Sequence, residues 1–128
     1  MIGPYHHIKT DAFRQQAEDG RPDQERSGMA FARWLASEFH ERGETRATVR
    51  SENFGWSVTL RREPFVVRVE CGSRDENLSD WGAYVVAQPS LAQRMFSRIE
   101  VQRQVDRLSK LLGEIVKSAP GTTPPPEE

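Results

Sequence analysis

Apolar and polar side chains alternate one by one through the middle of this chain, over residues 45–88. Successive side chains of a β-strand point to opposite faces, so such alternation is typical of a sheet with one buried face. The apolar positions form three sets: Phe54, Trp56, Val58 and Leu60; Phe65, Val67, Val69 and Cys71; and Trp81, Ala83, Val85 and Ala87. The pattern therefore predicts an antiparallel sheet that needs a cover on one side only.

Four consecutive strands are predicted, near 44–50, 54–62, 65–71 and 81–88. The polar segments between them favour a meander in which each strand pairs with the next one along the chain. Three cross-strand pairs give registers that keep the apolar side chains on one face: Val49 with Phe54, Arg61 with Val66, and Cys71 with Trp81. Agreement among three separate turns supports the meander.

Two amphipathic helices flank this sheet in the sequence. The first is predicted from residue 22 or 23 to residue 42, with Gly43 as its C-terminal cap. The second is predicted from residue 91 or 98 to residue 117, and its apolar stripe consists of Val101, Val105, Leu108, Leu112 and Ile115. Because one face of the sheet must be covered, we expect an α+β fold in the order α-β-β-β-β-α with both helices on that face.

The length of 128 residues suits one domain, which we place at residues 1–118. Residues 1–22 give no clear pattern, although residues 5–9 leave room for an additional N-terminal edge strand. Residues 119–128 are rich in proline and have little to bury, so they predict a disordered tail.

Charge and cysteine content narrow the classes of protein to consider. The formal net charge of −1 gives no global field that would attract nucleic acid or an anionic membrane. No apolar run approaches the roughly 20 residues of a membrane span, and the first residues do not resemble a secretory signal. Cys71 is the only cysteine, so no intrachain disulfide can form. We therefore expect a cytoplasmic protein that makes no contact with membranes.

The residues that usually carry chemistry are poorly placed for it. His6 and His7 are adjacent, so in a strand they point to opposite faces and cannot share one metal ion. Cys71 falls in the apolar phase of its strand with no base nearby to activate it. The acidic residues of the 72–80 segment suit a solvated turn. We expect no catalytic residue, no metal and no cofactor, and we lean against an enzyme without deciding the point.

The polar face of the predicted sheet is the best candidate for a binding surface. It carries arginine and tyrosine beside Val66 and Val86, a composition that is enriched at protein interfaces. The residues that we predict to contact a partner are Arg50, Arg61, Arg68 and Tyr84. The partner is expected to be another protein, and a homodimer is left open.

The second predicted strand opens with the run Glu52-Asn53-Phe54-Gly55-Trp56. With the Cys71-Gly72 strand end and Trp81, this run resembles small bacterial α+β proteins that carry an acidic-x-aromatic-Gly-Trp strand motif. The resemblance spans residues 28–112, and members have Glu-Asp where this chain has Glu52-Asn53. It implies no catalytic residue. Similar compact α+β domains serve as immunity proteins against bacterial toxins, an analogy at the level of fold.

Three hypotheses about function follow. The first is a non-enzymatic protein-binding domain, either immunity-like or regulatory. The second is a small-molecule-binding or minor catalytic domain, with a pocket between the helices and the end of the sheet that holds Trp56 and Trp81. The third is nucleic-acid binding through the arginine-rich face, which the nearly neutral net charge disfavours.

Overall fold

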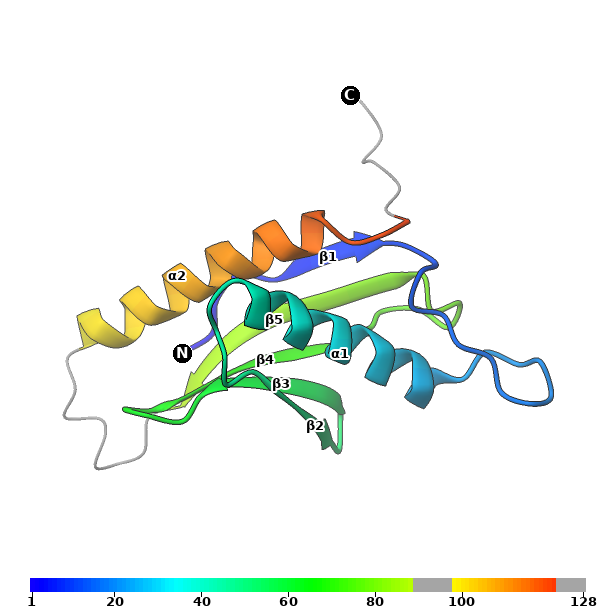
Figure 1. The fold of residues 1–128 in the computed structure, drawn as a ribbon, viewed down its shortest axis with the longest axis horizontal. Coiled ribbons are helices and arrows are strands. Elements are labelled where there is room, and N and C mark those ends of the chain that lie inside the picture. Colours follow the sequence, from blue (N-terminus) through cyan, green and yellow to red (C-terminus); the bar gives the residue numbers. More distant parts are fainter. Residues whose placement is uncertain (89–97, 122–128) are drawn as a thin grey trace, which may run out of the picture.

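The computed structural model describes residues 1–88 and 98–121 of the chain. One antiparallel sheet lies beneath two helices (Figure 1). The elements are β1 (His6–Lys9), α1 (Gln24–Glu41), β2 (Thr48–Glu52), β3 (Gly55–Arg61), β4 (Val66–Ser73), β5 (Asp80–Gln88) and α2 (Arg98–Lys117). The strand order is β1-β5-β4-β3-β2. The α+β meander with helices on one face is therefore confirmed, and β1 makes it a sheet of five strands rather than four.

The hydrophobic core lies between the sheet and the two helices. Helix α1 packs on β2, β3 and β4, while α2 packs on β1 and β5. The alternating apolar residues of the strands meet the apolar stripes of the helices, and the largest fully buried side chains are Trp81, Phe31, Phe39, Phe65 and Leu35. This burial is the main favourable contribution to folding, at about 25 cal/mol per Å² of apolar surface.

The strand registers are partly as predicted. In the β3–β4 hairpin, Val58 pairs with Val69 as expected. Val49 pairs with Val58 instead of Phe54, and Cys71 pairs with Ala83 instead of Trp81, so those two registers are wrong. Both partners move by an even number of residues. Because side chains alternate with a period of two, an even shift leaves Val49 and Cys71 on their predicted faces.

An irregularity in β3 changes the face of one residue. The register shifts between Thr59 and Arg61, so that Arg61 pairs with Val67 rather than with Val66. A bulge of this kind adds one residue to one strand, and the residues beyond it change faces. Arg61 therefore lies on the helix side of the sheet, and its predicted place on the polar face is wrong.

Helix α1 begins and ends with specific caps. The Asp23 carboxylate accepts a hydrogen bond from the Arg26 backbone N–H and so caps the helix, which begins within two residues of its predicted start. At the other end Gly43 has a φ of +99°, a conformation that favours glycine. The Glu44 N–H donates to the Phe39 carbonyl oxygen at 2.9 Å and brings the chain back toward the sheet.

The N-terminal segment adds strand β1 to the β5 edge of the sheet. Strand β1 pairs with β5, so the edge strand that the sequence left open is present. The small residues of α2 make room for it: His6 Nε2 lies 3.1 Å from Ser109 Oγ, and a Cβ on Gly113 would lie 2.9 Å from the His6 ring. Burial under α2 lowers the pKa of His6. Phe13, in the following loop, is 5% exposed and packs on Phe31.

The predicted C-terminal tail divides into two parts. Ala119 is buried, and the Thr10 hydroxyl donates to the Pro120 carbonyl oxygen at 2.5 Å, so this start of the segment packs against the N-terminal loop. Residues 122–128 lie outside the described residues, as do residues 91–97 of the longer predicted helix. Neither α1 nor α2, in the described part of the chain, is both long and apolar enough to cross a membrane.

Candidate functional site

The face of the sheet that is turned away from the helices is called the outer face here. One row of cross-strand neighbours on this face consists of Arg50, Ser57, Glu70 and Tyr84. The next row consists of Thr48, Thr59, Arg68 and Val86. The β3 members are small and lie beneath their longer neighbours, so that Ser57 and Thr59 are buried although they face outward.

Hydrogen bonds and an ion pair connect the larger side chains of the outer face. Arg68 donates to Glu70 Oε1 at 2.9 Å and to Gln88 Oε1 at 2.6 Å. The Tyr84 hydroxyl donates to the other carboxylate oxygen of Glu70. This hydrogen bond, followed by burial and the Glu70 charge, raises the pKa of Tyr84. The network connects four side chains and compensates the charge of Arg68.

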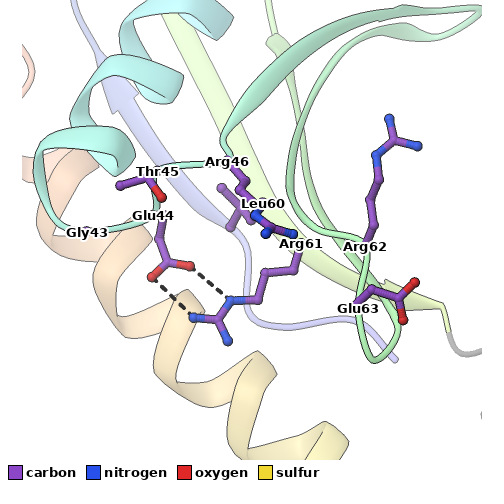
Figure 2. Close-up of a pocket in the computed structure, with 8 residues that line it drawn as sticks. All are labelled: Gly43, Glu44, Thr45, Arg46, Leu60, Arg61, Arg62 and Glu63. Atoms are coloured by element: carbon purple, nitrogen blue, oxygen red, sulfur yellow. Dashed lines mark hydrogen bonds and ion pairs between the residues drawn. The ribbon is translucent and has the colours of Figure 1, made fainter.

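The four residues that the sequence predicts as partner contacts do not lie together. Arg50, Arg68 and Tyr84 are on the outer face, in two adjacent rows. Arg61 instead approaches Glu44, whose side chain is only 6% exposed (Figure 2). Arg61 Nε lies 3.1 Å from Glu44 Oε1, and Arg107 of α2 lies 3.6 Å from Glu44 Oε2. This cluster joins α2, the end of β3 and the loop after α1, which is a structural role.

The pocket beside this ion cluster has few groups that could bind a ligand. It holds about 260 Å³ and is lined by Gly43, Glu44, Thr45, Arg46, Leu60, Arg61, Arg62 and Glu63 (Figure 2). Its one buried carboxylate, Glu44, is already paired with two guanidinium groups. The pocket therefore has no free buried group with which to orient a ligand.

A different hollow lies at the opposite end of the sheet, around Phe54. On the helix side it has about 440 Å³ between the start of α1 and the β2–β3 turn. On the outer face it has about 150 Å³ between Tyr5 and Phe54. The two parts share Phe54, Gly72 and Ser73 as lining residues, and together they are called the Phe54 groove below.

Missing side chains create the Phe54 groove. Four glycines line it: Gly28, Gly55, Gly72 and Gly82. Gly72 and Gly82 are direct cross-strand partners on the outer face. The Tyr5 side chain covers Gly82, where a Cβ would collide with its hydroxyl, and the space over Gly72 is open. Two exposed aromatic side chains line this part of the groove: Tyr5 is 48% exposed and Phe54 is 60% exposed. Phe54 is therefore not on the buried face, contrary to the sequence prediction.

The acidic-x-aromatic-Gly-Trp run forms one wall of the Phe54 groove. All five of its residues, Glu52 to Trp56, line the larger part. The alternation assigned Phe54 to the core because it continues the phase of Trp56, whereas the structure places it in a two-residue turn before β3. The sequence therefore predicted a pocket near Trp56 only on the helix side, and the part of the groove on the outer face was missed. The glycines at strand ends were the signal that could have indicated it.

Tyr5 is held in place at the outer end of the Phe54 groove. Its ring lies 6.0 Å from the ring of Tyr84 and 6.3 Å from that of His7. The Arg74 guanidinium lies 5.4 Å from the Tyr5 ring centroid, a cation–π distance. This end of the groove is therefore bordered by the Tyr5 ring, with the Arg74 guanidinium packed against it.

The acidic residues and other residues that could bind a metal, outside the groove, have structural roles or lie apart from one another. In the segment 72–80, the Asp75 carboxylate accepts hydrogen bonds from the backbone N–H groups of Ser79 and Asp80 and so organises a turn. Within residues 1–88 and 98–121, no three His, Cys, Asp or Glu side chains are grouped so that they could hold a metal ion.

Cys71 is expected to resist alkylation in the folded protein. It is 7% exposed, and burial, followed by the Glu70 charge, raises its pKa to about 12. The thiol is therefore protonated at pH 8, where an unfolded cysteine is partly the reactive thiolate. We expect iodoacetamide labelling at pH 8 to be slower by at least about a hundredfold in buffer than in denaturant. Equal rates would contradict the buried position of Cys71.

The comparisons with known proteins identify no relative of this chain. No protein-family model matches it, and no curated protein or solved structure is significantly similar to it. The resemblance to small bacterial α+β proteins therefore stays a prediction, and the function has to be argued from the groove and the outer face.

Proposed function

We propose that this domain binds another protein without catalysing a reaction, and that the Phe54 groove with the adjoining outer face is its docking site. The observation that carries the proposal is the exposure of Phe54 and Tyr5 beside a hollow lined by glycines. Large apolar side chains that are exposed together commonly mark interaction sites. Aromatic residues also supply much of the binding energy at protein interfaces.

The dimensions and surroundings of the groove suit a few side chains of a protein partner. The outer part, of about 150 Å³, has room for one side chain against the backbone of Gly72, beside the Tyr5 ring that covers Gly82. The row with Arg50 and Tyr84 continues from this part across the sheet and supplies polar groups for the rim of an interface. An immunity-like or regulatory factor, which acts by covering a surface of its partner, needs only such a site.

A photo-crosslinking residue at position 54 tests the proposal. In cells that make the protein, we expect p-benzoylphenylalanine at Phe54 to form a crosslink to a discrete partner. The matched control is the same residue at Ile99, which is 64% exposed and lies at the start of α2, away from the groove. We expect no such crosslink from the control position. Equal crosslinking from both positions, or from neither, would count against the proposal.

A second measurement separates lost binding from lost folding. Because Phe54 is 60% exposed, Phe54→Ser removes little buried surface, and we expect its melting temperature to stay close to that of the original protein. The variant should nevertheless lose most of its affinity for the crosslinked partner. Unchanged affinity would show that the partner binds elsewhere.

One observation favours the small-molecule hypothesis as an alternative. The half-buried Trp56 lines the larger part of the groove, on the helix side where that hypothesis placed a pocket, whereas Trp81 is fully buried. A ligand at a hundred times its Kd would stabilise the fold by about 2.7 kcal/mol. A thermal-shift screen would therefore detect it, and Trp56→Phe should weaken any hit that uses the groove.

A further inference from the structure

Strand β2 is an open edge of the sheet. It is the last strand in the order β1-β5-β4-β3-β2, and within the described residues it pairs only with β3 (Figure 1). An edge strand presents N–H and C=O groups that are free to pair with another strand. Its sequence, Thr-Val-Arg-Ser-Glu, contains neither the proline nor the lysine that often blocks an edge. Thr48, Arg50 and Ser51 are exposed along it.

The charges of β2 are arranged symmetrically about one residue. Arg50 and Glu52 both lie on the outer face, on either side of Ser51, which points to the helix side. Ser57 donates a hydrogen bond to Glu52 Oε1 at 3.0 Å, which holds this carboxylate on the outer face. Arg50 is exposed, and no ion pair between described residues includes it.

We propose that β2 pairs antiparallel with β2 of a second copy of this chain, around a twofold axis at Ser51. In this register Arg50 lies directly opposite Glu52 of the second copy, and the symmetry repeats the pair. Opposite charges at directly opposed positions stabilise an antiparallel pair, and the same patch serves both copies. The two five-stranded sheets become one continuous sheet with a shared outer face. This contact borders the Phe54 groove, whose larger part is also lined by Ser51 and Glu52, but it is made by the strand edge and not by the aromatic walls of the groove.

The charge pattern selects this register over its neighbours. Pairing centred on Arg50 would overlap all of β2 but would place the two Arg50 side chains opposite each other, and like charges there are destabilising. Pairing centred on Val49 would place Arg50 opposite Thr48, and Glu52 would face Arg46, which lies in the turn before β2 and not in the strand. Only the register centred on Ser51 gives Arg50 an opposite charge within the strand.

The small contact predicts a weak dimer. The Ser51-centred register overlaps only the last three residues of β2. The area buried by so short an overlap is well below the roughly 1,000 Å² of a stable interface. We therefore expect a monomer–dimer equilibrium that is visible only at high protein concentration. Added salt should weaken it, because the ion pairs are exposed to solvent.

Reciprocal charge exchange tests the proposal by sedimentation velocity over roughly a hundredfold range of protein concentration. Arg50→Glu and Glu52→Arg each place like charges opposite one another, and we expect each to weaken dimerisation by about tenfold or more. The double variant, Arg50→Glu with Glu52→Arg, restores opposite charges and should dimerise within about threefold of the original protein. Ser57→Ala controls for the hydrogen bond that Glu52→Arg removes.

A disulfide reports the centre of the pairing directly. With the axis at Ser51, the two position-51 Cα atoms should lie about 4.5–5.5 Å apart, within the Cα separation that a disulfide spans. Ser51→Cys should therefore form a covalent dimer on mild oxidation. Thr48→Cys is the matched control, because its two copies would lie about 20 Å apart. The native Cys71 is buried and should not contribute.

Several outcomes would overturn the proposal. These are a protein that stays monomeric at the highest concentration, a double charge variant that remains as weak as the single variants, or a Thr48→Cys crosslink as efficient as that of Ser51→Cys. Phe54→Ser should dimerise normally. A loss of dimer in that variant alone would place the contact at the Phe54 groove and would also overturn the edge pairing.

Discussion

Replacing Val58 with aspartate is expected to remove most of the stability of this protein. Val58 is 0% exposed, lies in the middle of β3 between Val49 and Val69, and faces α1. The substitution would bury a carboxylate that has no partner, and a buried unpaired charge is among the most damaging changes known. We expect a loss of about 4 kcal/mol or more, which approaches the whole stability of a small domain. Urea unfolding followed by circular dichroism measures it.

The neighbouring Thr59→Asp is the matched control, because it adds the same charge on the opposite face. The alternation alone predicts that Thr59 is open to water, yet it is 5% exposed beneath the long side chains of the outer face. Arg68 is its direct cross-strand neighbour and can pair with the new carboxylate. We therefore expect a loss of about 1–2 kcal/mol. Equal losses for the two variants would mean that the sheet does not have one buried face.

The architecture of the sheet could be predicted because alternation defines faces independently of register. Two of the three predicted hairpin registers are wrong, but Val49 and Cys71 still occupy their predicted faces because both shifts are even. The register itself depends on the turn. The alternation does not determine which residues form that turn, and here Asn53 and Phe54 form it.

Arg61 and Phe54 could not be placed from the alternation. The β-bulge near Thr59 reverses the face of Arg61, and nothing in the local pattern indicates where one residue is added. Glu44, which Arg61 pairs with, follows a helix cap and resembles an ordinary surface residue. Arg61 and Glu44 come together only through tertiary packing. The local sequence pattern therefore could not show that Arg61 is absent from the predicted arginine surface.

The N-terminal segment and the groove also depend on distant contacts. Residues 1–22 gave no clear pattern, yet Phe13 packs against Phe31 and Trp81 in the core. The outer part of the groove depends on three distant segments, because Gly72 pairs with Gly82 and Tyr5 lies over Gly82 while the space over Gly72 stays open. In contrast, the run from Glu52 to Trp56 was identified from the sequence, and the structure places it along the groove.

The contact between Gly28 and Trp56 explains a glycine in the first turns of α1. Glycine inside a helix costs about 1 kcal/mol relative to alanine. A Cβ at position 28 would lie 2.6 Å from Trp56 Cδ1 and 2.8 Å from Nε1, closer than atoms can approach without a shift. The glycine thus lets the indole lie directly against the helix backbone and form part of the Phe54 groove.

A double-mutant cycle between these two residues should show a reversal of sign. In the original protein we expect Gly28→Ala to destabilise by about 1–2 kcal/mol, because the displacement of the indole outweighs the gain in helix propensity. In a Trp56→Val background the obstacle is gone, and Gly28→Ala should stabilise by up to about 1 kcal/mol. Urea unfolding of the four proteins measures both values.

The control for the cycle is Ser37→Ala, a substitution at an exposed position of the same helix. Its effect should be the same in both backgrounds, because Ser37 is more than two turns away from Gly28 along α1. If Gly28→Ala also had the same effect in both backgrounds, the indole would not lie against Gly28. The wall of the Phe54 groove would then have to be built differently, since Trp56 would no longer be fixed by the helix.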